Sequence, residues 1–308
     1  MDMEALARFW PLIYSTIREL WEITEPSIED AAVKNDIPIE LYYYSELGLE
    51  VFSVENFFYR DPFTNPEQFE KAFARFDVKG WITPLPDEEY QVSRRAQDAV
   101  RQIINVGNEQ LTGFDLISDD ELKHVMALLK QIVNANLEAP EPPEKWAIVK
   151  RFRVANVQSP LIVQIKEALL DLFAYRDDSH LSAAYPHYGQ AGIVWSVLGY
   201  IARGNAVTAK QMAGSMTFRG YGTEDYEVAI AATVELGWAE PADVQDAYRI
   251  TPKGREIREE VDKLTDEYFY RPWSVLADNE VDELYGLLTK LHSQLVIYKR
   301  TIAGDGRI

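Results

Sequence analysis

Apolar residues recur at helical spacing along this chain, most clearly in its second half. Residues 159–175 and 190–204 each carry such a pattern, and Gly204 is suited to end the second helix. Thr208 and Thr223 are each placed to cap a further helix. The helix that follows Thr223 directs one set of side chains to a single face: Tyr226, Ala229, Ile230, Thr233 and Val234.

A β-hairpin and two long helices are expected next. "WAEP" (238–241) and "AYRIT" (247–251) flank the acidic tip "ADVQD" (242–246) as two short strands. Thr251, followed by Pro252 at the first helical position, begins a helix that extends to about Tyr268. A last helix is expected from Asp278 to about Tyr298. This order of elements is that of a winged helix-turn-helix, in which a hairpin "wing" follows the second helix of the motif.

The first half repeats this pattern. "FEKAFARFDVKGWITP" (69–84) aligns with "YEVAIAATVELGWAEP" (226–241), and "SDDELKHVMALLKQIV" (118–133) aligns with "ADNEVDELYGLLTKLH" (277–292). Ser53 takes the place of Thr208, and "ITPLPDEEYQV" (82–92) takes the place of the hairpin. A proline- and glutamate-rich segment at residues 139–154 is typical of a linker. We therefore predict a winged-helix copy at residues 1–138 and another at 155–302, mainly α with small β-hairpin wings.

The residues of the second copy resemble a known family. "LGWAEPADVQDAYRITPKGREI" (236–257) is similar to the strand–wing–helix passage of MarR-family transcription regulators, and both aligned closing segments resemble that family's last helix. The resemblance covers most of residues 155–300 and extends more weakly to 5–135, where "QVSRRAQDAV" (91–100) replaces the Thr-Pro-Lys-Gly helix start. It implies that the two copies form a pseudo-twofold dimer within one monomeric chain. Two independent winged helices joined by a linker are the alternative.

The charge of the chain argues against nonspecific binding to polyanions. The chain has 31 basic and 50 acidic residues, a formal net charge of −19. Such a charge disfavours nonspecific contact with nucleic acid or anionic membranes, although a local basic patch can survive within it. The chain has no cysteine, no long apolar run and no signal-peptide pattern at its start. We expect a cytoplasmic protein.

A resemblance to DNA readers directs attention to cations near the recognition-type helices and wings. The candidate DNA contacts are Lys71, Arg75, Lys79, Arg94, Arg95, Arg249, Lys253 and Arg255. Pairing of Lys71 and Arg75 with Glu67 and Glu70 inside their own helix is an equally good interpretation. The second recognition-type helix has no basic residue, and both wing tips are acidic. Double-stranded DNA is therefore only one candidate partner.

Two other kinds of binding site are open. In MarR-like dimers, effectors lie between the dimer helices and the winged lobe, which makes aromatic residues of the expected helices candidates for binding an aromatic or apolar effector: Trp10, Tyr14, Trp21, Tyr43, Tyr44, Tyr185, His187, Tyr188 and Trp195. These residues could equally fill the core. The second recognition-type helix presents Val228, Ala231 and Ala232 among glutamates, a small and acidic face on which a protein partner could dock.

No catalytic or cofactor signature was found. The segment "YRDDSHLSAAYPHYGQ" (175–190) holds two histidines and two aspartates, but their spacing is not that of a metal site, and we predict a polar loop. The chain lacks a nucleophile elbow and a phosphate loop. We expect no enzyme, no metal and no cofactor. The pattern favours a transcription-regulator-like protein, and the alternative is a winged-helix scaffold that has lost DNA binding and binds protein or small molecules.

Overall fold

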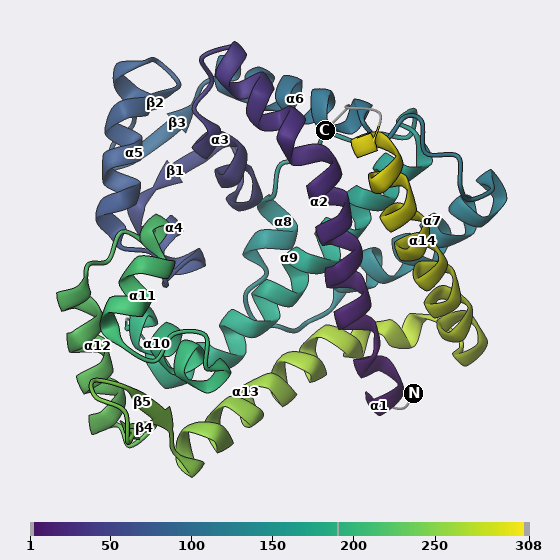
Figure 1. Cartoon of the computed structure of the whole chain (residues 1–308). Coiled ribbons are helices and arrows are strands. Elements are labelled where there is room, and N and C mark those ends of the chain that lie inside the picture. The colour runs from purple at the N-terminus through teal and green to yellow at the C-terminus, as the bar shows by residue number, and fades with distance from the viewer. Residues whose placement is uncertain (1–2, 190, 305–308) are drawn as a thin grey trace. The chain divides into compact units, whose positions relative to one another are not determined.

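The computed structural model describes residues 3–189 and 191–304 (Figure 1). Residues 1, 2 and Gln190, where the predicted copies and helices included them, lie outside this part. The elements of the first half are α1 (Met3–Ala7), α2 (Phe9–Lys34), α3 (Ile39–Tyr44), η1 (Ser45–Leu47), β1 (Val51–Ser53), α4 (Val54–Arg60), α5 (Pro66–Val78), β2 (Ile82–Pro84), β3 (Glu89–Val92), α6 (Arg94–Glu109) and α7 (Asp119–Glu138).

The second half is again mainly helical. Its elements are α8 (Trp146–Lys150), α9 (Leu161–Tyr188), α10 (Gly192–Arg203), α11 (Ala209–Ser215), η2 (Thr217–Arg219), α12 (Thr223–Glu235), β4 (Ala239–Pro241), β5 (Tyr248–Ile250), α13 (Pro252–Tyr270), η3 (Arg271–Val275) and α14 (Asp278–Gly304). None of the described helices is both long enough and apolar enough to cross a lipid bilayer.

The same order of elements occurs in both halves. A long helix (α2 or α9) is followed by a second helical segment, a short helix, the recognition-type helix (α5 or α12), a hairpin and two long helices. In the first half, β1 adds a strand to the hairpin, with Phe52 opposite Tyr90. In the second half, the backbone N–H of Tyr248 donates to the carbonyl of Val207 at the matching place. The recurring order agrees with the predicted duplication, which itself stays a prediction.

Contacts divide the described residues into two compact units, and each unit takes segments from both halves. Unit 1 contains the segments up to Leu49, from Arg94 to Ser179 and from Asp266 onward. Unit 2 contains Glu50–Ser93 and His180–Thr265, and thus both hairpins and both recognition-type helices. We call Glu50–Ser93 the first winged lobe and His180–Thr265 the second winged lobe. The predicted boundaries at residues 138 and 155 remain untested by this division.

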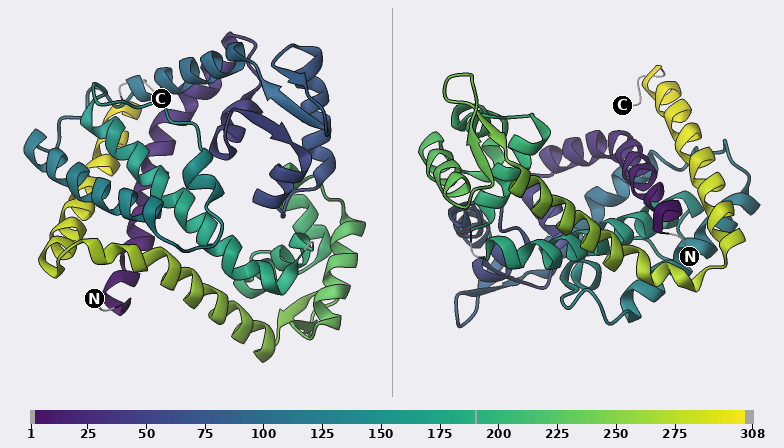
Figure 2. Two further views of the ribbon diagram at one scale, coloured as in Figure 1. Left: turned by 180° about the vertical axis from the view of Figure 1, so that it is seen from behind. Right: turned by 90° about the horizontal axis from the view of Figure 1, so that it is seen from below.

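The core of unit 1 depends on α14, which packs against α2 (Figure 2). Phe9 of α2 is fully buried and meets the rings of Trp273 and Tyr285 edge-on, at 4.8 and 5.3 Å between ring centroids. On the surface of the same pair, the Nζ atom of Lys299 lies 2.6 Å from a carboxylate oxygen of Glu19. The first helix of one half and the last helix of the other thus bury each other's apolar faces.

Most local predictions for unit 2 are confirmed. Ser53 and Thr208 cap α4 and α11 by accepting from the backbone N–H groups of Asn56 and Gln211. In α12, Tyr226, Ala229, Ile230 and Thr233 are buried, as the helical spacing predicts, while Val234 is only half-buried. The predicted cap at Thr223 is wrong. Thr223 is instead the first residue of α12, and Gly222 is the N-cap, with its backbone N–H donating to the carboxylate of Asp225 at 2.8 Å.

The polar loop predicted at 175–190 is also wrong, because α9 continues through it to Tyr188. Asp178 explains why the polar residues are tolerated. It is buried, and its two carboxylate oxygens accept from the backbone N–H groups of Ala147 (2.9 Å) and Ile148 (3.0 Å) at the start of α8. An aspartate inside one helix therefore caps another helix, which lies in the segment predicted to be a linker.

Replacing Asp178 with asparagine should lower the free energy of unfolding by about 1–3 kcal/mol, because the amide nitrogen cannot accept from a backbone N–H. Chemical denaturation followed by circular dichroism measures this. Asp30→Asn, at an exposed position of α2, is the matched control and should change little. Equal stability of the two variants would contradict the capping role.

Candidate functional site

Helix α5 is the recognition-type helix of the first lobe, and it carries three candidate cations. The Oδ1 atom of Asn65 caps it by accepting from the backbone N–H of Glu67 at 3.0 Å. Its buried face is apolar, so Lys71, Arg75 and Lys79 are all exposed. Lys71 pairs with Glu67 at 2.9 Å, as the intrahelical interpretation predicts, and Arg75 and Lys79 also interact within the chain.

The first turn of α5 is covered by the second lobe. The backbone N–H of Asn65 donates to the carbonyl of Arg219 at 2.9 Å, and the Asn65 side-chain amide donates to the carbonyl of Gly220 at 3.3 Å. The Arg219 guanidinium also pairs with Asp61 at 3.1 Å. Recognition helices usually contact base edges through their N-terminal residues. At α5, the capping residue Asn65 already has partners in the second lobe and Gln68 packs against Gly220, whereas Glu67 is exposed.

Gly220 is required for this close approach. It adopts a left-handed conformation with φ of 74°, which residues with a Cβ atom rarely adopt. A Cβ atom placed there would lie 2.3 Å from the side chain of Gln68 on α5. The contact between the two lobes thus combines hydrogen bonds, an ion pair and a glycine at a close approach.

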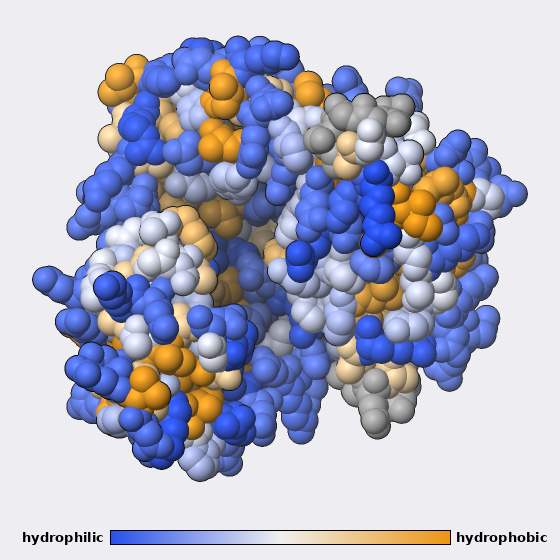
Figure 3. All heavy atoms as spheres, viewed as in Figure 1, coloured by the Kyte–Doolittle hydropathy of each residue, from blue (hydrophilic) through white to orange (hydrophobic). Residues whose placement is uncertain are grey.

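Helix α12 presents a small, acidic face to solvent. Val228 is 72% exposed, Ala231 is exposed and Ala232 is partly exposed. Exposed glutamates at 224, 227 and 235 surround them, and the helix contains no lysine or arginine. Figure 3 shows apolar side chains at the surface of the second lobe among polar ones. This face has no group suited to a phosphate.

The wings have acidic, exposed tips. Asp87 and Glu88 of the first wing and Asp246 of the second all adopt positive φ values, between 58° and 60°. At the base of the second wing, Arg249 pairs with Glu240 at 2.8 Å, and the Lys253 ammonium donates to the carbonyl of Leu236 at 2.8 Å.

The eight candidate DNA contacts therefore fall into three groups. Lys71, Arg75 and Lys79 share α5, whereas Arg249, Lys253 and the exposed Arg255 lie at the base of the second wing. Arg94 and Arg95 are part of unit 1, at the start of α6, where Arg94 lies 3.7 Å from Asp98. A role of these side chains in DNA contact stays a prediction.

The aromatic candidates pack mainly on one another. In unit 1, Trp10, Tyr14 and Trp21 all contact the ring of Phe173. In unit 2, His187 and Tyr188 lie against Trp195, at 6.1 and 6.3 Å between centroids, and Tyr185 contacts Tyr188. Tyr43 is half exposed with its hydroxyl near Glu29, and its neighbour Tyr44 also interacts within the chain. An aromatic effector pocket remains a prediction beside the simpler role of filling the core.

The histidines of residues 175–190 do not gather with carboxylates. The His180 ring lies between Trp195 and Thr265, with a ring nitrogen 3.4 Å from the Trp195 Nε1 atom. Over residues 3–189 and 191–304, no three or more histidines, aspartates or glutamates are grouped to hold a metal ion.

A buried charged cluster in unit 1 was missed by the sequence analysis. Arg151 is almost fully buried, and it pairs with Glu46 (3.3 Å), Glu167 (3.2 Å) and Asp171 (2.9 Å). Burial opposes its charge, but these carboxylates raise the pKa of Arg151 above its usual value. Its partners lie on η1 and α9, not next to Arg151 in the sequence. The sequence could have indicated this cluster only through the charged residues at inward-facing positions of α9.

Lys166 lies in the same region, and its charge is only weakly stabilised. It is buried on α9, and its Nζ atom donates to the Oδ1 atom of Asn108 at 2.8 Å. Burial lowers the pKa of Lys166 to about 8, although the nearby carboxylates of Glu167 and Glu46 oppose this shift.

Comparison with known proteins agrees with the class of protein that the fold defines. The fold is that of a mainly helical protein with small antiparallel wings, a winged helix-turn-helix architecture. Residues 174–299 match the model of a helix-turn-helix family, from the middle of α9 into α14. Searches among characterised proteins and among solved structures gave no match. The second half of the chain thus carries a helix-turn-helix domain.

The low pKa of Lys166 predicts a pH-dependent stability. Between pH 8 and about 10.4 the unfolded lysine holds a proton that the folded one has lost, so the free energy of unfolding rises with pH. Relative to Lys166→Met, the wild type should gain about 2–3 kcal/mol from pH 8 to 10. Urea denaturation at each pH tests this, with the exposed Lys34→Met as control. Parallel pH profiles for wild type and Lys166→Met would refute it.

Proposed function

We propose that this protein is a MarR-like, regulator-type protein, formed by tandem duplication, whose recognition-type helices do not read DNA bases. The recurring order of elements supports the duplication and the internal pseudo-dimer. The match of residues 174–299 to a helix-turn-helix family supports descent from a DNA-binding regulator. One observation supports the inference that α5 does not read bases: the start of α5, at Asn65, is bonded to Arg219 and Gly220 of the second lobe.

Electrostatics support the same proposal. Nonspecific DNA affinity comes mainly from lysines and arginines that neutralise phosphates, and base recognition adds side chains such as arginine or asparagine in the major groove. Helix α12 offers neither, both wing tips are acidic, and the chain carries a net charge of −19. We therefore propose a role that is exerted through binding of molecules other than DNA.

The partner that best fits α12 is a protein segment with basic and small apolar side chains. The small residues Ala231 and Ala232 permit close approach of a partner backbone, and Val228 supplies exposed apolar surface. The surrounding glutamates complement lysine or arginine, and such complementarity favours specificity and fast association.

A second function is favoured by the family match and by the cations of α5. In this alternative the protein is a transcription regulator in which Lys71, Arg75 and Lys79 contact phosphates after the lobes separate. An aromatic or apolar effector would then bind among the aromatic residues of one unit, such as Trp195 and its neighbours, and change the affinity for DNA.

Fluorescence anisotropy with a labelled mixed-sequence duplex separates the two functions. We expect no saturable binding at low salt for the wild type or for Lys71→Glu with Arg75→Glu. Binding that is strong at low salt, falls with added salt and disappears in this double variant would overturn the proposal in favour of the DNA-binding function. Lys34→Glu, which changes the net charge away from α5, controls for general electrostatic repulsion.

The α12 face is tested by Val228→Lys with Ala232→Lys. Because Val228 is exposed and Ala232 partly exposed, the free energy of unfolding should change by no more than about 0.5 kcal/mol. Proteins retained from a cell extract by the immobilised wild type should be lost with this variant and kept with Lys34→Glu. An identical set of bound proteins for the wild type and the α12 variant would exclude this face.

A further inference from the structure

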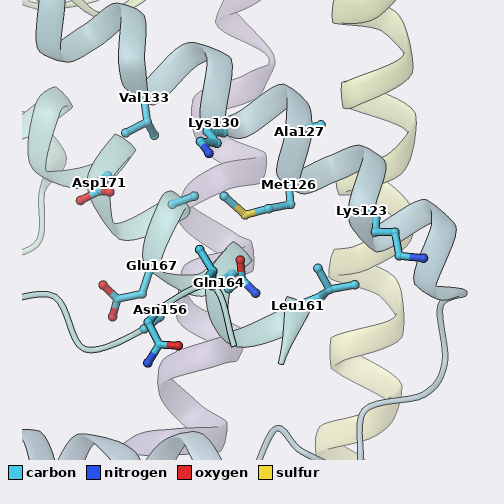
Figure 4. Close-up of a pocket in the computed structure, with 13 residues that line it drawn as sticks. Lys123, Met126, Ala127, Lys130, Val133, Asn156, Leu161, Gln164, Glu167 and Asp171 are labelled. Carbon is cyan, nitrogen blue, oxygen red and sulfur yellow. The ribbon is translucent and has the colours of Figure 1, made fainter. Parts of the chain in front are cut away.

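Unit 1 contains a hollow of about 450 Å³ between α7 and the start of α9 (Figure 4). Its volume is within the range of small-molecule pockets. Thirteen residues line it: Lys123, Met126, Ala127, Lys130 and Val133 of α7, Ala155, Asn156 and Val157 of the preceding segment, and Leu161, Gln164, Glu167, Ala168 and Asp171 of α9.

Comparison with the aligned helix α14 explains why this space is open. Tyr285 of α14 packs on Phe9 of α2 and lies under the guanidinium of Arg8, at 4.2 Å. The alignment of the two closing segments places Met126 where α14 has Tyr285. On α14, the aromatic ring of Tyr285 fills the space next to α2. On α7, the smaller, flexible Met126 and the neighbouring Ala127 leave the corresponding space next to α9 unfilled.

The lining predicts an aliphatic ligand. Its apolar members are alanine, valine, leucine and methionine, and no lining residue is aromatic. Of these, Val133 and Ala168 are buried, and Met126 and Leu161 are half-buried. A flexible alkyl chain fits such a surface better than a planar ring does.

The charges around the hollow predict an anionic head group. The two acidic residues of the lining are already engaged, since Asp171 pairs with Arg151 and Arg153 and Glu167 pairs with Arg151. On the other side, Figure 4 shows Lys123 pointing away from the hollow, where it pairs with Asp120 at 3.1 Å. Lys130 of α7 lines the hollow, and its ammonium group has no hydrogen bond or ion pair with the rest of the described chain.

We propose that this hollow binds a medium-chain aliphatic carboxylate, with its chain against Met126, Val133 and Leu161 and its carboxylate on Lys130. The inference deepens the proposed function, because it names a ligand class for a regulator-type protein. Its site differs from the aromatic pocket expected from the sequence.

Isothermal titration calorimetry of the full chain with octanoate, octanol and octylamine tests the proposal without DNA. We expect octanoate to bind with a stoichiometry of one, more tightly than octanol, and octylamine not to bind. Lys130→Gln should weaken octanoate binding about tenfold, toward the affinity for octanol. Lys34→Gln, which removes another exposed ammonium, should leave the affinity unchanged.

Ala127→Trp fills the hollow from an exposed position of α7 and should abolish binding while unchanged circular dichroism shows that the chain is folded. Octanoate binding that neither Ala127→Trp nor Lys130→Gln affects would overturn the proposal, as would the absence of saturable binding. Binding of octylamine as tight as that of octanoate would overturn the assigned head group. A wild-type dimer that Ala127→Trp dissociates would identify the hollow as an interface instead. None of these results bears on the DNA experiment, so the two proposals can fail separately.

Discussion

The packing of α14 on α2 is the constraint on which the rest of the structure depends. Each helix has an apolar stripe that is buried in the core of unit 1: Ile13, Ile17 and Leu20 on α2, and Leu284, Leu288 and Leu291 on α14. Burying one such side chain contributes about 1.5–3 kcal/mol. Because these helices come from opposite halves of the sequence, neither half can complete its own core. This is why unit 1 draws on the beginning, middle and end of the chain.

The charged residues of the two units lie in different places: those of unit 1 include a buried cluster, whereas those discussed in unit 2 are at the surface. In unit 1, Arg151 is held by three carboxylates away from solvent, where an unpaired charge would be costly. In unit 2, the tips of both wings are acidic, α12 has no basic residue, and Lys71 and Arg249 pair with Glu67 and Glu240. The fold thus has the order of elements of a helix-turn-helix protein, and the charges of unit 2 are the basis for proposing that it does not read DNA bases.

The sequence was sufficient for most features that depend on neighbouring residues, although the cap of α12 lies one residue before the predicted Thr223. The caps at Ser53 and Thr208, the helix end at Gly204, both hairpins and the buried face of α12 follow from local spacing and turn chemistry. Features that depend on distant residues could not be predicted. Asp178 looked like part of a polar loop because its partners at α8 are about thirty residues away.

The candidate sites show the same limit. Sequence spacing identified the cations of α5 and the small residues of α12 as surface groups, and both sets are at the surface. It could not show that Arg219 and Gly220 cover the first turn of α5, since these segments are about 155 residues apart. The hollow beside Met126 was equally hidden, because a pocket arises from volume that no side chain fills, and composition does not reveal such volume.

The difference between Met126 and Tyr285 has a consequence for stoichiometry. A homodimer of identical subunits presents every pocket twice, and the paired sites can influence each other's affinity. In the proposed duplication, two copies joined in one polypeptide can differ, so that one closing helix keeps its aromatic ring while the other has a methionine. Under the proposed binding, a hollow beside one closing helix without a matching one beside the other would take up one ligand per molecule along a simple hyperbolic curve, and the response would be graded rather than cooperative.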